Sequence, residues 1–198
     1  MLYSVLLLLA SVIGILLFLH VFELFLDLLL HEFDKYQTRR IMERKLFIET
    51  YDFPGGIIEK VKYHYPHLND GQLSRVMEGL RTYFIICGRD RHVSMPSQVA
   101  TVAWQEFILT YRESCLRLEI LKPLKVNLFF SRTEDGVNYA WELCCKLETI
   151  DAKKPIHLPL LFALDAELDI PDGFHDSLDD WARRYYEYIK AKAVESAG

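Results

Sequence analysis

Residues 95–112 of the chain read MPSQVATVAWQEFILTYR and predict one long, packed α-helix. Ser94 and Pro96 give a start signal, and the pattern runs toward Leu121, before Pro123. Apolar residues recur every three or four positions, which puts them on one continuous face of a helix. They are Trp104, Phe107, Ile108, Tyr111, Cys115 and Leu118. We therefore expect this face, Trp104 included, to pack into a core.

Further helices are predicted on both sides of this one, and no alternating segment is long enough for a sheet. Their expected ranges are 55–64, 70–87, 133–147, 159–168 and 176–194. Asn69 or Asp70 can cap the helix over 70–87. The short apolar run VNLFF (126–130) fits either a strand or an extended packed segment. The expected fold is an irregular all-α bundle.

The N-terminal segment 2–19, LYSVLLLLASVIGILLFL, carries no charge. Its length reaches that of a transmembrane helix, at about 1.5 Å per residue against about 30 Å of hydrocarbon. A cleaved signal peptide is disfavoured because no Lys or Arg precedes residue 35 and no Ala-x-Ala site follows. We expect a single-pass anchor over 1–30 that contacts the lipid bilayer through residues 2–26.

Two further segments are expected after the anchor: a charged helical stalk over 31–52 and an acidic α-helical domain over 53–198. The basic residues of the first 45 positions all lie between 35 and 45, so the positive-inside rule places the C-terminal domain in the cytoplasm. The four cysteines, at 87, 115, 144 and 145, form no CxxC motif and indicate a reducing compartment.

The charge of the chain argues against a nucleic-acid partner. Net charge is −5 and the pI is about 5.8. Basic and acidic residues balance over 1–45, so the excess negative charge belongs to 46–198. Phosphate contacts supply most nucleic-acid affinity, and an acidic domain without a basic stripe offers few of them.

The candidate functional surface combines a triplet in the 95–112 helix with the polar loop after residue 87. Its residues are Trp104, Gln105, Glu106, Arg89, Arg91 and His92. Gln105 lies on the polar side of the predicted helix and Glu106 on a third side. The loop is a candidate anion contact, with a solvated turn as the simpler interpretation.

Other chemistry is weakly indicated. His64 and His67 would need two more ligands to bind zinc. Glu23, Asp27 and His31 share a helix face, which suits a solvated stripe or self-association better than a metal. The acidic run over 165–176 lacks the glycine and bidentate glutamate of a calcium loop. No P-loop, GxSxG, HExxH or GxGxxG motif occurs, so no catalytic, cofactor-binding or metal-binding residue is predicted.

Two stretches carry a resemblance to a known family. MPSQVATVAWQEFILTYR (95–112) resembles the motif of an uncharacterised bacterial family, in which Met-Pro-Ser precedes a Trp-His-Glu-Phe-Ile-Leu block. LPLLFALDAELDIPDGF (158–174) resembles that family's other motif, and a looser Trp-His likeness extends to plant glycine-rich-domain proteins. The resemblance covers about residues 60–175. A bacterial family together with the predicted anchor makes the bacterial inner (cytoplasmic) membrane the expected location.

The chain departs from this family pattern in one way that bears on chemistry. Gln105 stands where the family has histidine, and no His-His-Thr-Pro-like segment follows Cys115. Glutamine does not titrate and is a poor metal ligand, so a histidine-based role in relatives does not transfer. The family implies no activity.

The sequence favours a non-catalytic, membrane-tethered helical interaction module that binds a protein partner or a second copy. The alternative is a metal-dependent or acid/base enzyme that uses Glu106 with His64, His67 or His92. A third hypothesis is that the stalk itself drives homodimerisation.

Overall fold

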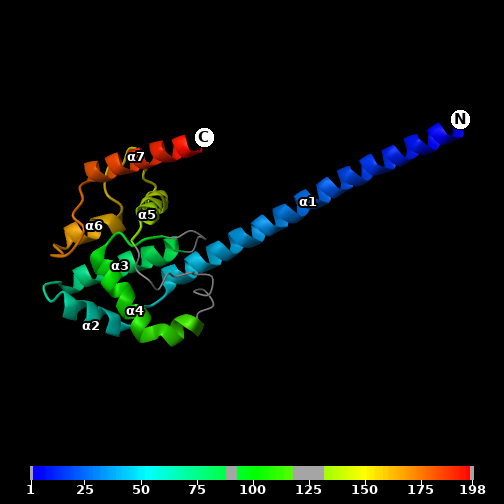
Figure 1. Cartoon of the computed structure of the whole chain (residues 1–198). Helices are drawn as coiled ribbons and strands as arrows, with labels where there is room; N and C mark the ends of the chain where they lie inside the picture. The colour runs from blue at the N-terminus through cyan, green and yellow to red at the C-terminus, as the bar shows by residue number, and fades with distance from the viewer. Residues whose placement is uncertain (1, 88–92, 118–131, 197–198) are drawn as a thin grey trace. The chain divides into compact units, whose positions relative to one another are not determined.

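The computed structural model describes residues 2–87, 93–117 and 132–196 (Figure 1), with side chains described from Phe18 onward and up to Thr110 in the fourth helix. The chain divides into two compact units, Met1–Lys45 and Leu46–Gly198. Within the described ranges every regular element is an α-helix, so the all-α prediction is confirmed. The VNLFF run lies outside these ranges.

The first helix, α1 (Leu2–Thr50), is continuous through the predicted anchor and stalk. The predicted transmembrane helix is nevertheless wrong: among the residues that the structure describes, no helix is long and apolar enough to cross a membrane. The physical reason lies in the charges. Where side chains are described, from Phe18, acidic residues interrupt the apolar pattern at Glu23 and Asp27 and again before Lys35. Each such charge is costly in hydrocarbon.

Besides the end of α1, six helices lie in the described part of the unit Leu46–Gly198. They are α2 (Gly55–His64), α3 (Asp70–Ile86), α4 (Gln98–Arg117), α5 (Glu134–Leu147), α6 (Leu160–Glu167) and α7 (Leu178–Glu195). The helix predicted from residues 95–112 is α4, which packs on α2, α3 and α6. The five other predicted ranges each match a helix to within a few residues. Periodicity therefore located every helix of this unit.

The helix starts follow from local capping residues. Asn69, rather than Asp70, caps α3 in a reciprocal box with Gln72. Thr133 accepts the backbone N–H of Gly136 at the start of α5, and Ser177 forms a capping box at the start of α7. Each cap satisfies N–H groups that have no partner inside the helix.

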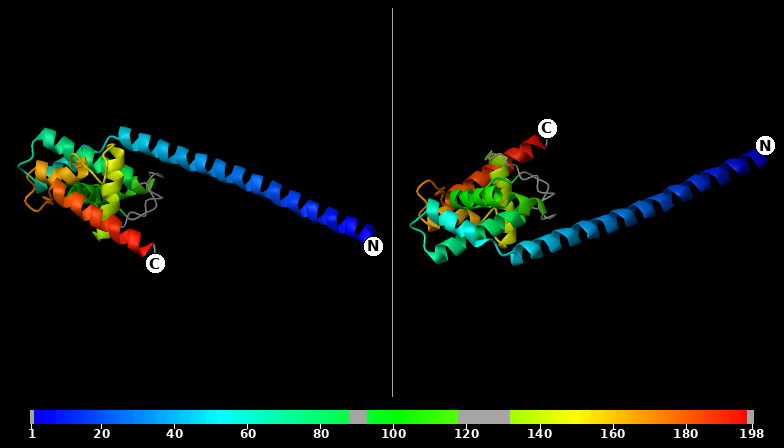
Figure 2. Two further views of the ribbon diagram at one scale, coloured as in Figure 1. Left: turned by 90° about the horizontal axis from the view of Figure 1, so that it is seen from above. Right: turned by 90° about the horizontal axis from the view of Figure 1, so that it is seen from below.

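Two aromatic clusters lie within the largely aliphatic core of this unit. Trp104 is 3% exposed and meets Tyr83 edge to face, which confirms its predicted place in the core. A second cluster joins α5, α6 and α7, whose ribbons lie together in Figure 2. There Trp141 stacks on Trp181, and both rings meet Phe162 edge to face.

Arg81 of α3 fixes the end of α1 within this unit. Its guanidinium donates to the backbone carbonyls of Ile48, Glu49 and Tyr51. The last carbonyls of a helix have no partner inside it, so a cation is well placed there.

Candidate functional site

Residues 18–33 of α1 expose many large apolar side chains. Eleven such side chains are each between 45% and 69% exposed. They are Phe18, Leu19, Val21, Phe22, Leu24, Phe25, Leu26, Leu28, Leu29, Leu30 and Phe33. A contiguous apolar surface of this kind is unusual, because exposed apolar residues are normally scattered singly over a protein surface.

This segment has two distinguishable faces. Phe18, Phe22, Phe25 and Leu29 follow the spacing i, i+4, i+7, i+11 and form the face that we call the phenylalanine seam. Phe18 and Phe22 already stack, with ring centroids 6.4 Å apart. The opposite face carries a polar stripe, His20, Glu23, Asp27 and His31. The seam therefore has the spacing of a helix-pairing surface, with ionisable groups turned away from it.

Glu106 is the centre of a polar cluster that joins α4 to α2. Its Oε2 accepts a hydrogen bond from Lys60 Nζ at 2.8 Å, and its Oε1 lies 3.2 Å from His64 Nε2. Lys60 also donates to Thr110 Oγ1 at 2.7 Å. The Glu106 side chain is only 18% exposed, whereas Lys60 and His64 are about half exposed. The cluster fastens the two helices at the edge of the unit.

The hydrogen bond from Lys60 is the largest cause of a lowered pKa of Glu106, and His64 adds to it, while partial burial opposes both. A carboxylate beside an imidazole can orient a general base. Here, however, the same carboxylate is shared with an ammonium group. Its simplest role is therefore structural.

Glu106→Gln should reduce the amount by which the free energy of unfolding falls as the solution is made acidic. A carboxyl whose folded pKa is lowered stabilises the fold above its unfolded pKa, and this contribution is lost as pH falls through the folded value. We expect a loss of about 1 kcal/mol at neutral pH that shrinks on acidification. Urea unfolding between neutral and acidic pH measures it, with Glu59→Gln on the exposed side of α2 as control. Equal acid sensitivity in wild type and Glu106→Gln would disprove this role.

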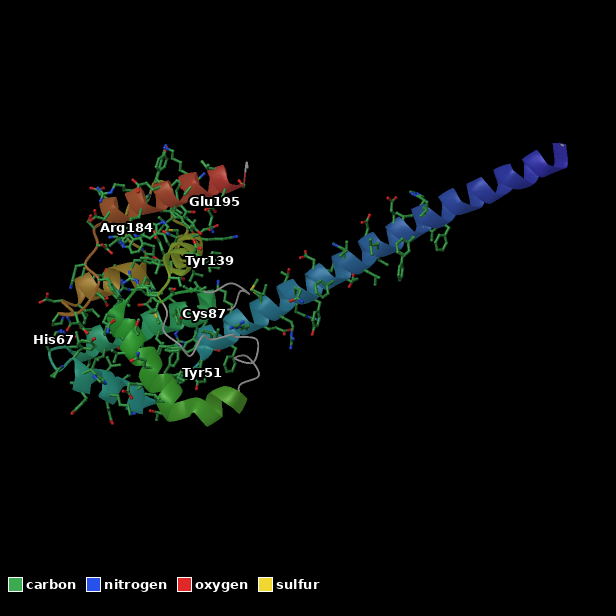
Figure 3. The ribbon with its side chains drawn as sticks, viewed as in Figure 1. Tyr51, His67, Cys87, Tyr139, Arg184 and Glu195 are labelled. Carbon is green, nitrogen blue, oxygen red and sulfur yellow. The ribbon has the colours of Figure 1, made fainter. Side chains whose placement is uncertain are left out.

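Of the other residues of the predicted surface, the structure describes Trp104 and Gln105, and neither belongs to the polar cluster around Glu106. Trp104 is in the core, and Gln105 is half-buried on α4. Arg89, Arg91 and His92 lie outside the described residues. His67, labelled in Figure 3, lies at the α2–α3 connection, where its Nε2 is 3.3 Å from the carbonyl oxygen of Leu168. Of the two suggested histidines that the structure describes, His64 lies beside Glu106 and His67 does not.

Asp165 accepts four hydrogen bonds, although no sequence pattern predicted a structural role for it. It is 1% exposed on α6. Its Oδ1 accepts from Ser97 Oγ at 2.7 Å and from Val99 N at 3.1 Å. Its Oδ2 accepts from Gln98 N at 2.6 Å and from Phe174 N at 2.9 Å. The carboxylate thus caps α4 from a different helix and joins the stretches 95–112 and 158–174.

Two neighbours complete this joint. Ser97, rather than Ser94, is the residue that caps α4, because its Oγ accepts from Ala100 N. Gly173 supplies close approach: a Cβ atom there would lie 2.6 Å from the Cβ of Asp165. Ser97 and Gly173 therefore both have structural roles: Ser97 caps α4, and Gly173 leaves room for the side chain of Asp165.

The acidic run over 165–176 does not converge on a cation. Its members are engaged separately: Asp172 accepts from Tyr65 Oη, Asp176 pairs with Arg184, and Glu167 pairs with Arg75. No group of three or more His, Cys, Asp or Glu side chains suited to a metal occurs among the described residues.

A cavity of about 670 Å³ lies between α3, α6 and the segment that follows α5. Carboxylates of Glu78, Glu148 and Glu167 line it, together with Arg75 and His157. Burial is the main cause of a raised pKa of Glu148, and the hydrogen bond from Leu160 N partly offsets it. No local sequence pattern predicts this cavity, because its walls come from residues far apart in the chain.

Comparison with known proteins gives one match. A family model described as UCP032817-like matches residues 43–195, which includes nearly all of the unit Leu46–Gly198. No curated protein and no solved structure matches the chain. The match agrees with the expectation of an uncharacterised family, while the two motifs and the plant likeness stay predictions.

Proposed function

Since the chain belongs to the UCP032817-like family, which is uncharacterised, we propose its function from its own surfaces: it is a helical interaction protein that associates through α1. The observation that carries the proposal is the exposed apolar segment 18–33. Burying one large apolar side chain contributes about 1.5–3 kcal/mol, so covering a few of these side chains supplies a substantial association free energy.

A second copy of the chain is the partner that best fits the phenylalanine seam. Two parallel copies in register place each apolar residue opposite its equivalent, and the spacing of Phe18, Phe22, Phe25 and Leu29 matches the seam of paired helices. The same arrangement keeps His20, Glu23, Asp27 and His31 in water, where their charges cost little. The unit Leu46–Gly198 is then the folded cargo that the pair presents.

The cysteines support a reducing environment for this unit. Cys87, Cys144 and Cys145 are free thiols. Burial raises the pKa of the Cys145 thiol to about 12 and holds that of Cys144 well above its usual value, so both stay protonated and unreactive. We propose that the cargo unit works where thiols stay reduced, without a nucleic-acid partner.

Glutamate substitutions on the seam test the proposal. In the full chain, Phe22→Glu with Phe25→Glu should weaken self-association at least about a hundredfold, because charges replace four apolar rings across a pair. The matched control is Leu24→Glu with Leu28→Glu, which adds the same charge to the same segment away from the seam. It should weaken association much less. Concentration-dependent light scattering measures both.

Two results would contradict self-association through the seam. One is equal loss in the seam and control variants, which would mean that general hydrophobicity drives the effect. The other is a chain that stays monomeric but cosediments with phosphatidylcholine vesicles, which would identify a lipid surface as the occupant.

A second candidate function, acid/base catalysis, is favoured by one contact, the 3.2 Å approach of His64 Nε2 to Glu106 Oε1. Such a pair can hold an imidazole in one orientation. The proposal of an interaction protein is better supported because Lys60 engages the same carboxylate. If catalysis is the function, any activity detected with the full chain should vanish in His64→Ala and persist in the seam variant.

A further inference from the structure

The cavity beside Glu148 has the size and chemistry of a small-ligand site. Its volume of about 670 Å³ falls inside the range of about 300–1,000 Å³ that is usual for such sites. α3 contributes Arg75, Glu78 and Thr82 to its walls, and α6 contributes Leu160, Ala163 and Glu167. The cavity belongs wholly to the unit Leu46–Gly198 and is independent of α1 and of the function proposed for it.

The charge of the walls selects a cationic ligand. Three carboxylates face one guanidinium, since Arg75 is 3.0 Å from Glu78 and 3.6 Å from Glu167. Arg75 is therefore already paired with two carboxylates. Arg75 and His157 both act electrostatically on Glu148, but neither forms an ion pair with it among the described residues. The net negative charge of the cavity wall would repel an anion and attract a cation.

Glu148 is the residue placed to receive that cation. It is half-buried at the C-terminal end of α5, where the helix dipole is also negative. Its Oε1 accepts a hydrogen bond from Leu160 N at 2.9 Å. Among the described contacts its Oε2 accepts none, and Glu148 lines the cavity. A partly desolvated carboxylate with an open acceptor is costly unless a donor meets it.

The geometry excludes a bare metal ion as the natural occupant. Metal ions need several ligand atoms that converge at short range, and no such group of side chains occurs among the described residues. The carboxylates come instead from α3, the end of α5 and α6, and Leu158, Leu160 and Ala163 add apolar surface to the same cavity. An organic ammonium group can meet one carboxylate while its hydrocarbon body covers this apolar surface.

We infer that this cavity binds a small aliphatic amine, with its ammonium group donating to Glu148 and its carbon chain lying against Leu158 and Leu160. A diamine fits best, because Glu78 and Glu167 line the same cavity and can receive a second ammonium group. The site is a binding site and requires no covalent step.

Titration calorimetry of the full chain with putrescine tests the inference. Putrescine should bind more tightly than butylamine, and butanediol, which has the same length without charge, should not bind. Glu148→Gln should weaken putrescine binding at least about tenfold, because a charge-assisted hydrogen bond is lost. The Gln side chain still offers an oxygen to Leu160 N, so the helix start is kept.

The matched control is Glu142→Gln, an exposed carboxylate on α5 that does not line the cavity. Its affinity for putrescine should stay within about twofold of wild type, since exposed charges at a distance are screened. Circular dichroism before each titration confirms that both variants are folded. The inference is overturned if folded Glu148→Gln binds putrescine as wild type does, if butanediol binds equally well, or if magnesium chloride binds in place of the amine.

Discussion

Replacing Asp165 by alanine should destabilise the unit Leu46–Gly198 by about 3–5 kcal/mol, because one buried carboxylate satisfies four donors. Three of these donors are at the start of α4, namely Ser97 Oγ and the N–H groups of Gln98 and Val99. The fourth is the N–H of Phe174. Removing the acceptor leaves these groups unpaired in a site that is 1% exposed, so water cannot replace it without opening the structure.

Urea unfolding monitored by circular dichroism measures the effect. Asp172→Ala is the matched control, because this exposed carboxylate accepts one hydrogen bond, from Tyr65 Oη at 3.2 Å. It should cost no more than about 1 kcal/mol. Asp165→Asn should fall between the two, since the amide keeps one oxygen but turns an NH₂ group toward N–H donors. Similar unfolding midpoints for Asp165→Ala and Asp172→Ala would show that Asp165 is not the joint described here.

Replacing Trp141 by alanine should cost a comparable amount, about 3–5 kcal/mol, through loss of buried aromatic surface and the cavity left behind. Trp141 is fully buried, its ring centroid is 5.6 Å from that of Trp181, and its Nε1 donates to Ala152 O at 3.2 Å. It therefore holds α7 and the segment after α5 together.

Two measurements check this prediction. The urea unfolding midpoint of Trp141→Phe should be well above that of Trp141→Ala, because phenylalanine keeps a ring against Trp181 while losing the hydrogen bond. Near-ultraviolet circular dichroism should lose the contribution of the stacked pair in both variants. A Trp141→Ala protein with the wild-type unfolding midpoint would mean that the aromatic cluster does not anchor α7.

The sequence predicted the helices of the folded unit because their signals are local. Periodicity put Trp104 in the core, and capping residues such as Thr133 and Ser177 define helix starts within one turn. Asp165 could not be recognised in the same way. Its partners Gln98 and Val99 lie more than 60 residues away, and nothing in the α6 sequence indicates which helix it will cap.

The candidate site was partly predictable for the same reason. Glu106 and His64 were named as potential partners, and the structure places them together. Lys60 was missed because, unlike a histidine, a lysine on a helix surface gives no sequence signal of a site. The error at the N-terminus came from giving apolar composition more weight than the acidic residues that recur from Glu23 onward. The phenylalanine seam was not predicted, because it is defined by which exposed side chains share one face of α1.

The molar mass of the full chain in solution tests the central claim that α1 is an association helix. Each chain has a mass of 23.3 kDa. Sedimentation equilibrium should give at least twice this mass for the full chain. A fragment beginning at Leu46, which keeps every buried core residue from Ile48 to Tyr185, should sediment as a monomer. A full chain that sediments at the mass of one copy over the whole concentration range would contradict the account.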